Sequence, residues 1–200
     1  MKFFLIRHAE TTANTKTVIL GRKDGGELSL RGRRQAKALA KRLSKEKISE
    51  IYCSTANRAR QTAEEIMRGR DCEIFYCDEL QEIDMGDLER LTHEEAEKRC
   101  PSIFNEISAD PKKRIPGGES VRDVQQRVMP LIEKLARKEG NPTIVAVGHS
   151  IVNRVILNSL LGIPLGSKAL KQKNCCIAML DAKPGLVQLY TLDNSIHAIK

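Results

Sequence analysis

Short apolar runs alternate with longer, periodically apolar segments along this chain of 200 residues. The runs are rich in bulky and β-branched side chains, which predicts strands rather than helices. Phe3 to Ile6 is apolar throughout, as is typical of a strand that is covered on both faces. The strands are expected at 3–6, 50–53, 73–77, 143–147, 178–180 and 187–192, with a turn at Pro184-Gly185 between the last two.

Between most of these strands, apolar residues recur at the spacing of an amphipathic helix. Leu39 and Leu43, for example, fall on one face of the segment that follows the first strand. Ser54, or Thr55 beside it, is expected to cap the second helix, and Pro130 to kink the third. The long helices are expected at 31–44, 54–67, 120–139 and 151–161.

The alternation of strands and helices is typical of βαβ units. We therefore predict an α/β fold, a three-layer α/β/α sandwich around a mostly parallel sheet. Residues 86–114 differ from the rest of the chain, because they are charged and contain Pro101, Pro111 and one short expected helix at 93–99. We interpret them as a short inserted cap within a single domain that spans residues 1–200.

Composition narrows the class of protein and the choice of ligand. The formal net charge of +8 favours an anionic ligand, whereas an aromatic content of only 4% argues against nucleic acid as a partner. No signal peptide is apparent, and no apolar stretch approaches the ~20 residues that span a membrane, so we expect a cytoplasmic protein without a membrane partner. The six cysteines lack metal-ligand spacing and are expected to be free thiols.

Two of the predicted strands end on a histidine. Arg7 and His8 follow the first strand directly, and His149 follows the strand at 143–147. Because the carboxyl ends of parallel strands meet at one edge of a sheet, these side chains are expected to converge there. Arg58 follows the strand at 50–53, and a guanidinium group can bind two phosphate oxygens at once. The combination favours a phosphate site.

The order of the motifs resembles that of the histidine phosphatase superfamily, also called phosphoglycerate-mutase-like, over nearly the whole chain. The matching residues are Arg7-His8-Ala9, Glu10, Thr11 and Asn14, then Ser54, Arg58, Thr62 and Ala63, then Leu80 and Glu82, then Gly118-Glu119-Ser120, and finally Gly148-His149-Ser150. Ala9 departs from the glycine of the family motif. An alanine would be strained there if the backbone required a positive φ.

The resemblance implies a role for each site residue. His8 would be the nucleophile that carries a phosphohistidine, and Glu82 would donate a proton to the leaving oxygen. Arg7, Arg58 and His149 would surround the phosphoryl oxygens. Two further substrate-binding residues are implied, Asn14 and Gly21. No metal ion and no cofactor are expected, because cationic side chains can supply the charge stabilisation that phosphoryl transfer needs.

We interpret the protein as a phosphomonoesterase that acts on a small phosphorylated metabolite. A phosphoglycerate mutase and a catalytically inactive, phosphate-binding regulatory protein are the alternatives. The mutase is disfavoured because the short cap offers few obvious cations, only Lys112, Lys113 and Arg114. Specificity is expected to depend on the cap and on the loop 15–26. Whether the protein is a monomer or a homodimer is left open.

Overall fold

The computed structural model of the chain describes residues 1–16, 18–22, 26–183 and 186–193. The strands are β1 (Lys2–Arg7), β2 (Glu50–Ser54), β3 (Glu73–Cys77), β4 (Thr143–Gly148), β5 (Ile177–Lys183) and β6 (Leu186–Asp193). The α-helices are α1 (Thr12–Thr15), α2 (Leu30–Arg42), α3 (Asn57–Met67), α4 (His93–Arg99), α5 (Ile103–Ala109), α6 (Val121–Ala136) and α7 (Ser150–Leu160). Each expected strand is present, and the predicted turn at Pro184-Gly185 lies outside the described residues.

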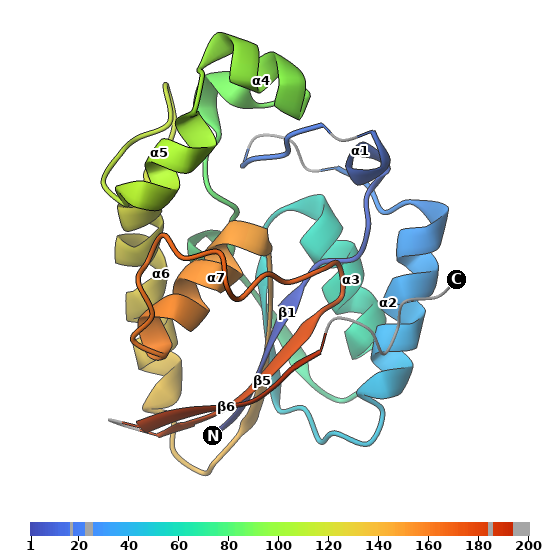
Figure 1. Cartoon of the computed structure of the whole chain (residues 1–200). Coiled ribbons are helices and arrows are strands. Elements are labelled where there is room, and N and C mark those ends of the chain that lie inside the picture. Colours follow the sequence, from blue (N-terminus) through green and yellow to red (C-terminus); the bar gives the residue numbers. More distant parts are fainter. Residues whose placement is uncertain (17, 23–25, 184–185, 194–200) are drawn as a thin grey trace.

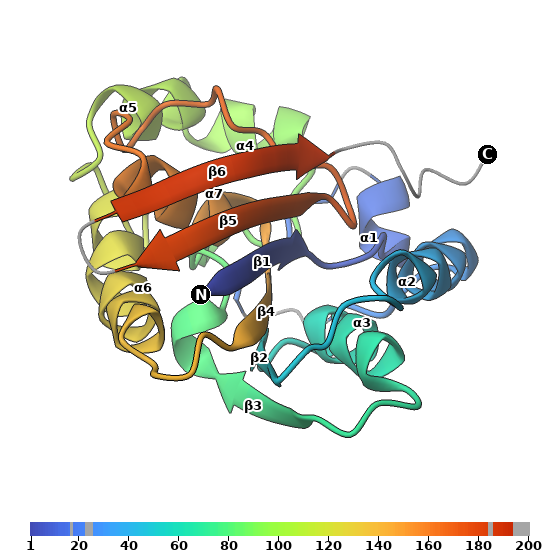
Figure 2. The ribbon, with the colours of Figure 1, turned by 90° about the horizontal axis from the view of Figure 1, so that it is seen from below.

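The six strands form one sheet in the order β3-β2-β4-β1-β5-β6, which Figure 2 shows from below. The pairs β1–β4, β2–β4 and β2–β3 are parallel, whereas β5 and β6 join antiparallel at one side. The parallel register places Arg7 opposite Gly148 and Cys53 opposite Val147. The carboxyl ends of β1, β2 and β4 therefore meet at one edge of the sheet, as predicted.

Helices cover both faces of the sheet: α2 and α3 lie on one side, and α6 and α7 on the other (Figures 1 and 2). Successive side chains of a strand point to opposite faces. Accordingly, Phe4 and Ile6 of β1 belong to the core that contains residues of α2 and α3, while Phe3 and Leu5 belong to the core that contains residues of α6 and α7. This arrangement confirms the predicted three-layer α/β/α sandwich.

The starts of α2, α6 and α7 lie within one residue of the expected starts, whereas the start of α3 differs. The hydroxyl groups of Ser29 and Ser120 accept hydrogen bonds from the first turns of α2 and α6, as N-cap residues do. The prediction that α3 begins at Ser54 is wrong, because this helix begins at Asn57 and Ser54 ends β2. The Ser54 hydroxyl has another partner, a ring nitrogen of His149 at 2.7 Å.

Residues 86–114 contain two helices, α4 and α5, where the sequence predicted one. Both helices lie beyond the edge of the sheet at which β1 ends (Figure 1). The expectation missed α5 because Pro101 and Pro111 lie just outside its two ends and favour loop structure. Its N-cap residue, Ser102, is left-handed with φ 61° and makes no side-chain cap, so the usual signal of a helix start is missing.

Candidate active site

A cavity of about 540 Å³ lies at this edge of the sheet, next to α4 and α5. Residues from the end of β1, the starts of α3 and α7, and the segment 86–114 line it. Of the predicted site residues, the cavity is lined by Arg7, His8, Asn14, Arg58 and Glu82. The structure therefore brings together side chains that lie far apart in the sequence.

His8 follows β1 and is held by hydrogen bonds of its backbone. Its N–H donates to the Gly148 carbonyl at 3.0 Å, and its carbonyl accepts from the Asn174 side chain at 3.1 Å. In the ring, Nδ1 lies 2.7 Å from the Ala9 carbonyl oxygen. A carbonyl can only accept, so Nδ1 carries the proton and Nε2 keeps its lone pair. Burial, followed by the charges of Arg58 and Arg7, holds the pKa of His8 well below its usual range.

Two guanidinium groups lie near His8, that of the fully buried Arg58 and that of the partly buried Arg7. Arg7 donates from Nη1 to the Gln172 carbonyl at 2.8 Å, and its buried Nε has no hydrogen-bond partner within the described part of the chain. Arg58 donates from Nε to Nδ1 of His149 at 3.1 Å and from Nη2 to the Gly21 carbonyl at 3.0 Å. Burial lowers the pKa of Arg7, which is the expected effect of removing a cation from water. A bound anion would offset that desolvation.

His149 is fully buried and lies outside the cavity lining. Its Nδ1 accepts from Arg58, so its proton is on Nε2, which donates to the Ser54 hydroxyl at 2.7 Å. This tautomer is the opposite of the one in His8, although the two rings are only 5.1 Å apart. Burial and the charge of Arg58 hold the pKa of His149 well below its usual range. His149 is therefore neutral, and its lone pair on Nδ1 is directed at Arg58.

Glu82 lies at the N-terminus of α7, although it is distant from that helix in the sequence. Its Oε1 accepts from the backbone N–H groups of Ile83, Ile151 and Val152, at 3.0, 3.2 and 3.2 Å. Its Oε2 accepts from the N–H of Ile151 at 3.1 Å. Free N–H groups at a helix start are a natural site for a carboxylate. These bonds hold the carboxyl group at the wall of the same cavity as His8.

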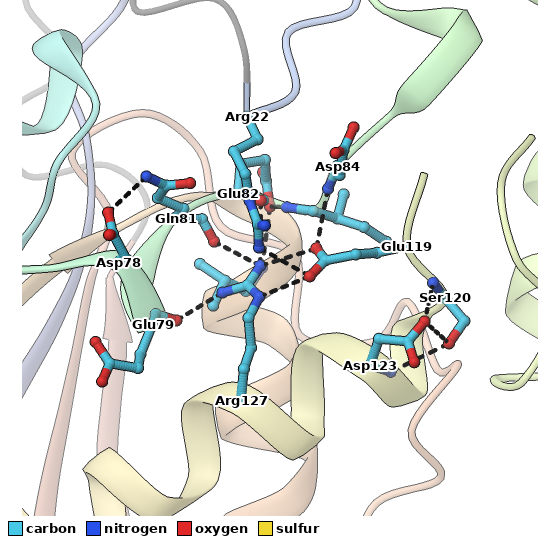
Figure 3. A network of polar contacts seen from close by, with 12 residues as sticks. Arg22, Asp78, Glu79, Gln81, Glu82, Asp84, Glu119, Ser120, Asp123 and Arg127 are labelled. Carbon is cyan, nitrogen blue, oxygen red and sulfur yellow. Dashed lines mark hydrogen bonds and ion pairs between the residues drawn. The ribbon is translucent and has the colours of Figure 1, made fainter. Parts of the chain in front are cut away.

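A network of polar contacts holds the loop that carries Glu82 (Figure 3). Arg127 of α6 binds both carboxylate oxygens of Glu119, at 3.0 and 3.1 Å. Arg22 reaches the same carboxylate from the other side at 2.8 Å, and the backbone N–H of Asp84 donates to it at 3.0 Å. Arg127 also donates to three backbone carbonyl groups of the loop, those of Glu79, Gln81 and Glu82. The loop is thus bound directly by Arg127 of α6 up to Glu82, and by Glu119, the partner of Arg127, at Asp84.

Comparison with known proteins identifies the family. A model of the histidine phosphatase superfamily (branch 1) matches residues 3–195. The chain belongs to this superfamily. It is 36% identical over 169 residues to phosphoserine phosphatase 1 of Hydrogenobacter thermophilus, covering 82% of this chain and 78% of the relative. It is 30% identical over 192 residues to a probable phosphoglycerate mutase, GpmB, of Escherichia coli, covering 93% and 87%.

Solved structures of the superfamily share the fold of the whole chain. A putative alpha-ribazole-5'-P phosphatase from Escherichia coli superposes with a TM-score of 0.86 at 26% identity, covering 98% of each chain. A mycobacterial glucosyl-3-phosphoglycerate phosphatase superposes with a TM-score of 0.85 at 26% identity, covering 97% of this chain and 99% of that chain. The histidine phosphatase fold expected from the motifs is therefore confirmed.

Two of the implied substrate-binding residues, Asn14 and Gly21, make local structural contacts, and Ala9 fits its backbone without strain. Asn14 lines the cavity, and its Oδ1 accepts from the Thr11 N–H at 3.1 Å in the capping box of the short, unpredicted helix α1. Gly21 contributes its carbonyl to Arg58, and a Cβ there would collide with the Glu89 carboxylate. Ala9, in contrast, is not among the residues with positive φ, so the alanine imposes no left-handed strain.

Sequence reasoning missed a group of cations in the cavity wall. These are Arg154 of α7 and, in the loop after that helix, Lys168 and Lys171. The signal for Arg154 was present, because it lies four residues after Ser150 and so shares a helix face with the strand end. No local signal marks the two lysines, which only the path of the loop brings to the site.

The predicted cap cations, in contrast, do not line the cavity. Lys113 pairs with Glu106 and Arg114 pairs with Asp123, each at 2.9 Å, on an exposed surface. The segment 86–114 contributes instead His93, Phe104, Ile107 and Ser108, and the loop after β1 contributes Val18, Ile19 and Leu20. Both regions expected to influence specificity therefore contact the cavity.

Among the residues that the structure describes, no group of three or more histidine, cysteine, aspartate or glutamate side chains could hold a metal ion. All six cysteines are free, as expected. No helix in the described ranges is long and apolar enough to cross a membrane.

Proposed function

We propose that this protein is a metal-independent phosphomonoesterase, which hydrolyses a small phosphorylated metabolite through a phosphohistidine at His8. The observation that carries the proposal is the hydrogen bond from Nδ1 of His8 to the Ala9 carbonyl. It leaves an unprotonated Nε2 in a cavity beside the guanidinium groups of Arg7 and Arg58. A neutral imidazole with a free lone pair is a competent nucleophile.

In the first step, Nε2 of His8 attacks phosphorus while the bond from phosphorus to the ester oxygen breaks. Glu82, in its protonated form, gives its proton to that oxygen, so the product leaves as a neutral alcohol. Arg7 and Arg58 stabilise the charge on the transferred phosphoryl group, the contribution that metal ions make in other phosphoryl-transfer enzymes. The Ala9 carbonyl stabilises the positive charge that develops on the His8 ring.

In the second step, water attacks the phosphorus of phosphohistidine and gives a proton to the Glu82 carboxylate. The bond from phosphorus to nitrogen breaks, its electron pair returns to Nε2 of His8, and inorganic phosphate leaves. Glu82 is then protonated for another turnover. His149 acts through Arg58 and not on the substrate, since its two ring nitrogens contact Arg58 and Ser54.

A mutase is the second candidate, because one relative is named a probable phosphoglycerate mutase. A mutase must hold its product and exclude water from the phosphohistidine. The cations Arg154, Lys168 and Lys171 weaken the sequence argument that few cations are available for that task. The names of the other relatives, which are phosphatases, favour hydrolysis.

Measurement of both products separates the two activities. Inorganic phosphate release is measured over a panel of phosphorylated glycerates, amino acids, sugars and nucleotides, with and without exhaustive chelation. We expect steady release from at least one ester, unchanged by the chelator. Incubation with 3-phosphoglycerate should give little 2-phosphoglycerate, with or without a bisphosphoglycerate primer. Primer-dependent interconversion that is faster than phosphate release would establish the mutase, and loss of activity on chelation would refute the metal-independent mechanism.

A further inference from the structure

The cavity is lined by more positive charge than a single phosphoryl group needs. Arg7 and Arg58 lie beside His8, where the phosphoryl group would bind. Arg154, Lys168 and Lys171 are three further cations in the lining of the same cavity. The Nζ of Lys168 donates to the carbonyl of Phe104 in α5 at 3.2 Å, which ties the loop after α7 to the segment 86–114.

Arg154 is the most informative of these cations, because its side chain is mostly buried and one of its buried donors has no hydrogen-bond partner in the described part of the chain. That donor is its Nε. Burial lowers the pKa of Arg154, and Glu82 is the carboxylate whose charge opposes that effect. A buried donor without a partner is costly, and an anionic ligand would satisfy it.

The position of Arg154 limits where such an anion would lie. Ser150 and Arg154 both line the cavity and are one turn apart on α7, about 6 Å along the helix axis. Ser150 directly follows the strand end at which the phosphoryl group would bind. The second anion would therefore lie only a few bonds away from the phosphorus atom. Phe104 and Ile107 line the cavity as well and provide an apolar surface for the carbon atoms between the two anions.

We propose that Arg154 binds a second anionic group on the leaving alcohol, so that the preferred substrates are phosphomonoesters with a carboxylate a few bonds from the ester oxygen. This inference rests on the proposed function, which it makes more specific. Lys168 and Lys171 add to the positive potential around that group. A guanidinium group binds a carboxylate through two parallel hydrogen bonds, which gives direction as well as attraction.

Three esters with matched carbon chains test the proposal: 3-phosphonooxypropanoate, propyl phosphate and 3-aminopropyl phosphate. The measured quantity is the ratio of kcat/KM between the acidic ester and propyl phosphate. We expect a ratio of about 10 to 100 in the unchanged protein, the usual strength of a hydrogen bond to a charged group. Arg154→Gln should bring the ratio to about 1 and raise the relative rate with the amine. Arg154→Lys should retain part of the preference.

Lys112→Gln is the matched control, because it removes the same charge from an exposed residue outside the cavity lining. The ratio should not change in this variant. A ratio near 1 in the unchanged protein would overturn the proposal. So would an equal loss on all three esters in Arg154→Gln, which would show that Arg154 acts only through Glu82.

A binding measurement keeps the test independent of turnover. The three esters are titrated into the His8→Ala protein by calorimetry, with and without Arg154→Gln. We expect the acidic ester to bind about tenfold more tightly than propyl phosphate, and the difference to disappear with Arg154→Gln. Should Arg154→Gln fail to fold, Arg154→Lys and Lys168→Gln should each still weaken the preference, and an unchanged preference in both would contradict the proposal. Selective binding without hydrolysis would refute the proposed function and leave this subsite standing.

Discussion

The two walls of the cavity are built in different ways. At the edge of the sheet, backbone hydrogen bonds hold the reactive residue: the His8 N–H donates to Gly148 of β4, and the His8 carbonyl accepts from Asn174. The opposite wall consists of side chains from short helices and loops, such as Phe104 and Lys168. A strand end cannot move without breaking the sheet, whereas a loop side chain can change without affecting the fold. We therefore expect the reaction to depend on the first wall and the choice of substrate on the second.

The largest effect should come from His8→Ala, which removes the reactive group from the sheet edge. Activity should fall by at least about 10³-fold on every ester, because no other group supplies the nucleophile. Brief incubation with a phosphorylated substrate should give an acid-labile, base-stable label on the unchanged protein and none on the variant. A label that persists in the variant, or that maps to His149, would show that the sheet edge uses another nucleophile.

Glu82→Gln should slow the hydrolysis of each ester by a factor that depends on how much its leaving oxygen needs a proton, and not on the shape of the alcohol. An alkyl phosphate needs a proton on its leaving oxygen, so its rate should fall by about 10²-fold or more, while nitrophenyl phosphate should lose far less. The measurement is kcat for the two esters in both proteins. Equal losses would mean that Glu82 positions the phosphoryl group and that another group is the acid.

Arg127→Gln should cause a smaller loss of the same kind, because Arg127 binds the carbonyl groups of Glu79, Gln81 and Glu82 itself. We expect kcat on alkyl phosphates to fall about tenfold, with a smaller change on nitrophenyl phosphate. Arg122→Gln is the control, since Arg122 is exposed on the same helix and its side chain contacts Gln125. A uniform loss on both esters that follows the loss of thermal stability would indicate a structural role only.

Phe104→Ala should change how strongly the protein prefers esters with a large alcohol group, and should not change how the rate depends on the acidity of the leaving group. An ester with an apolar body should lose about fivefold in kcat/KM, because about one kilocalorie per mole of apolar contact is removed. Ethyl phosphate, which is too small to reach that wall, should be nearly unaffected. If the two esters respond alike, the opposite wall is not the part of the cavity that selects the substrate.

The last prediction concerns the protonation states of the two histidines in the unchanged protein, and it is read from spectra instead of reaction rates. Burial lowers the pKa of both His8 and His149 well below the usual range, so both rings should stay neutral at the pH where an ordinary histidine titrates and gain a proton only at a clearly lower pH. Nitrogen-15 spectra should then show Nδ1–H in His8 and Nε2–H in His149. Matching tautomers, or protonation of either ring near pH 6.5, would contradict the arrangement at the sheet edge.

Sequence patterns predicted the sheet edge well because its signals are local. An apolar run followed by Arg7 and His8 carries both the strand and the reactive group within a few residues, and His149 repeats that pattern. The start of α3 was predicted wrongly for the opposite reason. Ser54 is a good cap residue by itself, yet its hydroxyl lies next to a histidine 95 residues away and so has a stronger partner than the helix.

Sequence patterns alone were enough to predict the six strands and the four long helices, the two faces of each strand, and which side chains lie at the strand ends. These follow from periodicity and from the backbone geometry of each element. Long-range packing was needed to show that Glu82 accepts hydrogen bonds from the start of α7, that the two histidines hold opposite tautomers, and that Arg154 lines the cavity while the cap cations do not. Those features depend on contacts between segments that are distant in sequence, and no local pattern records which distant groups will meet.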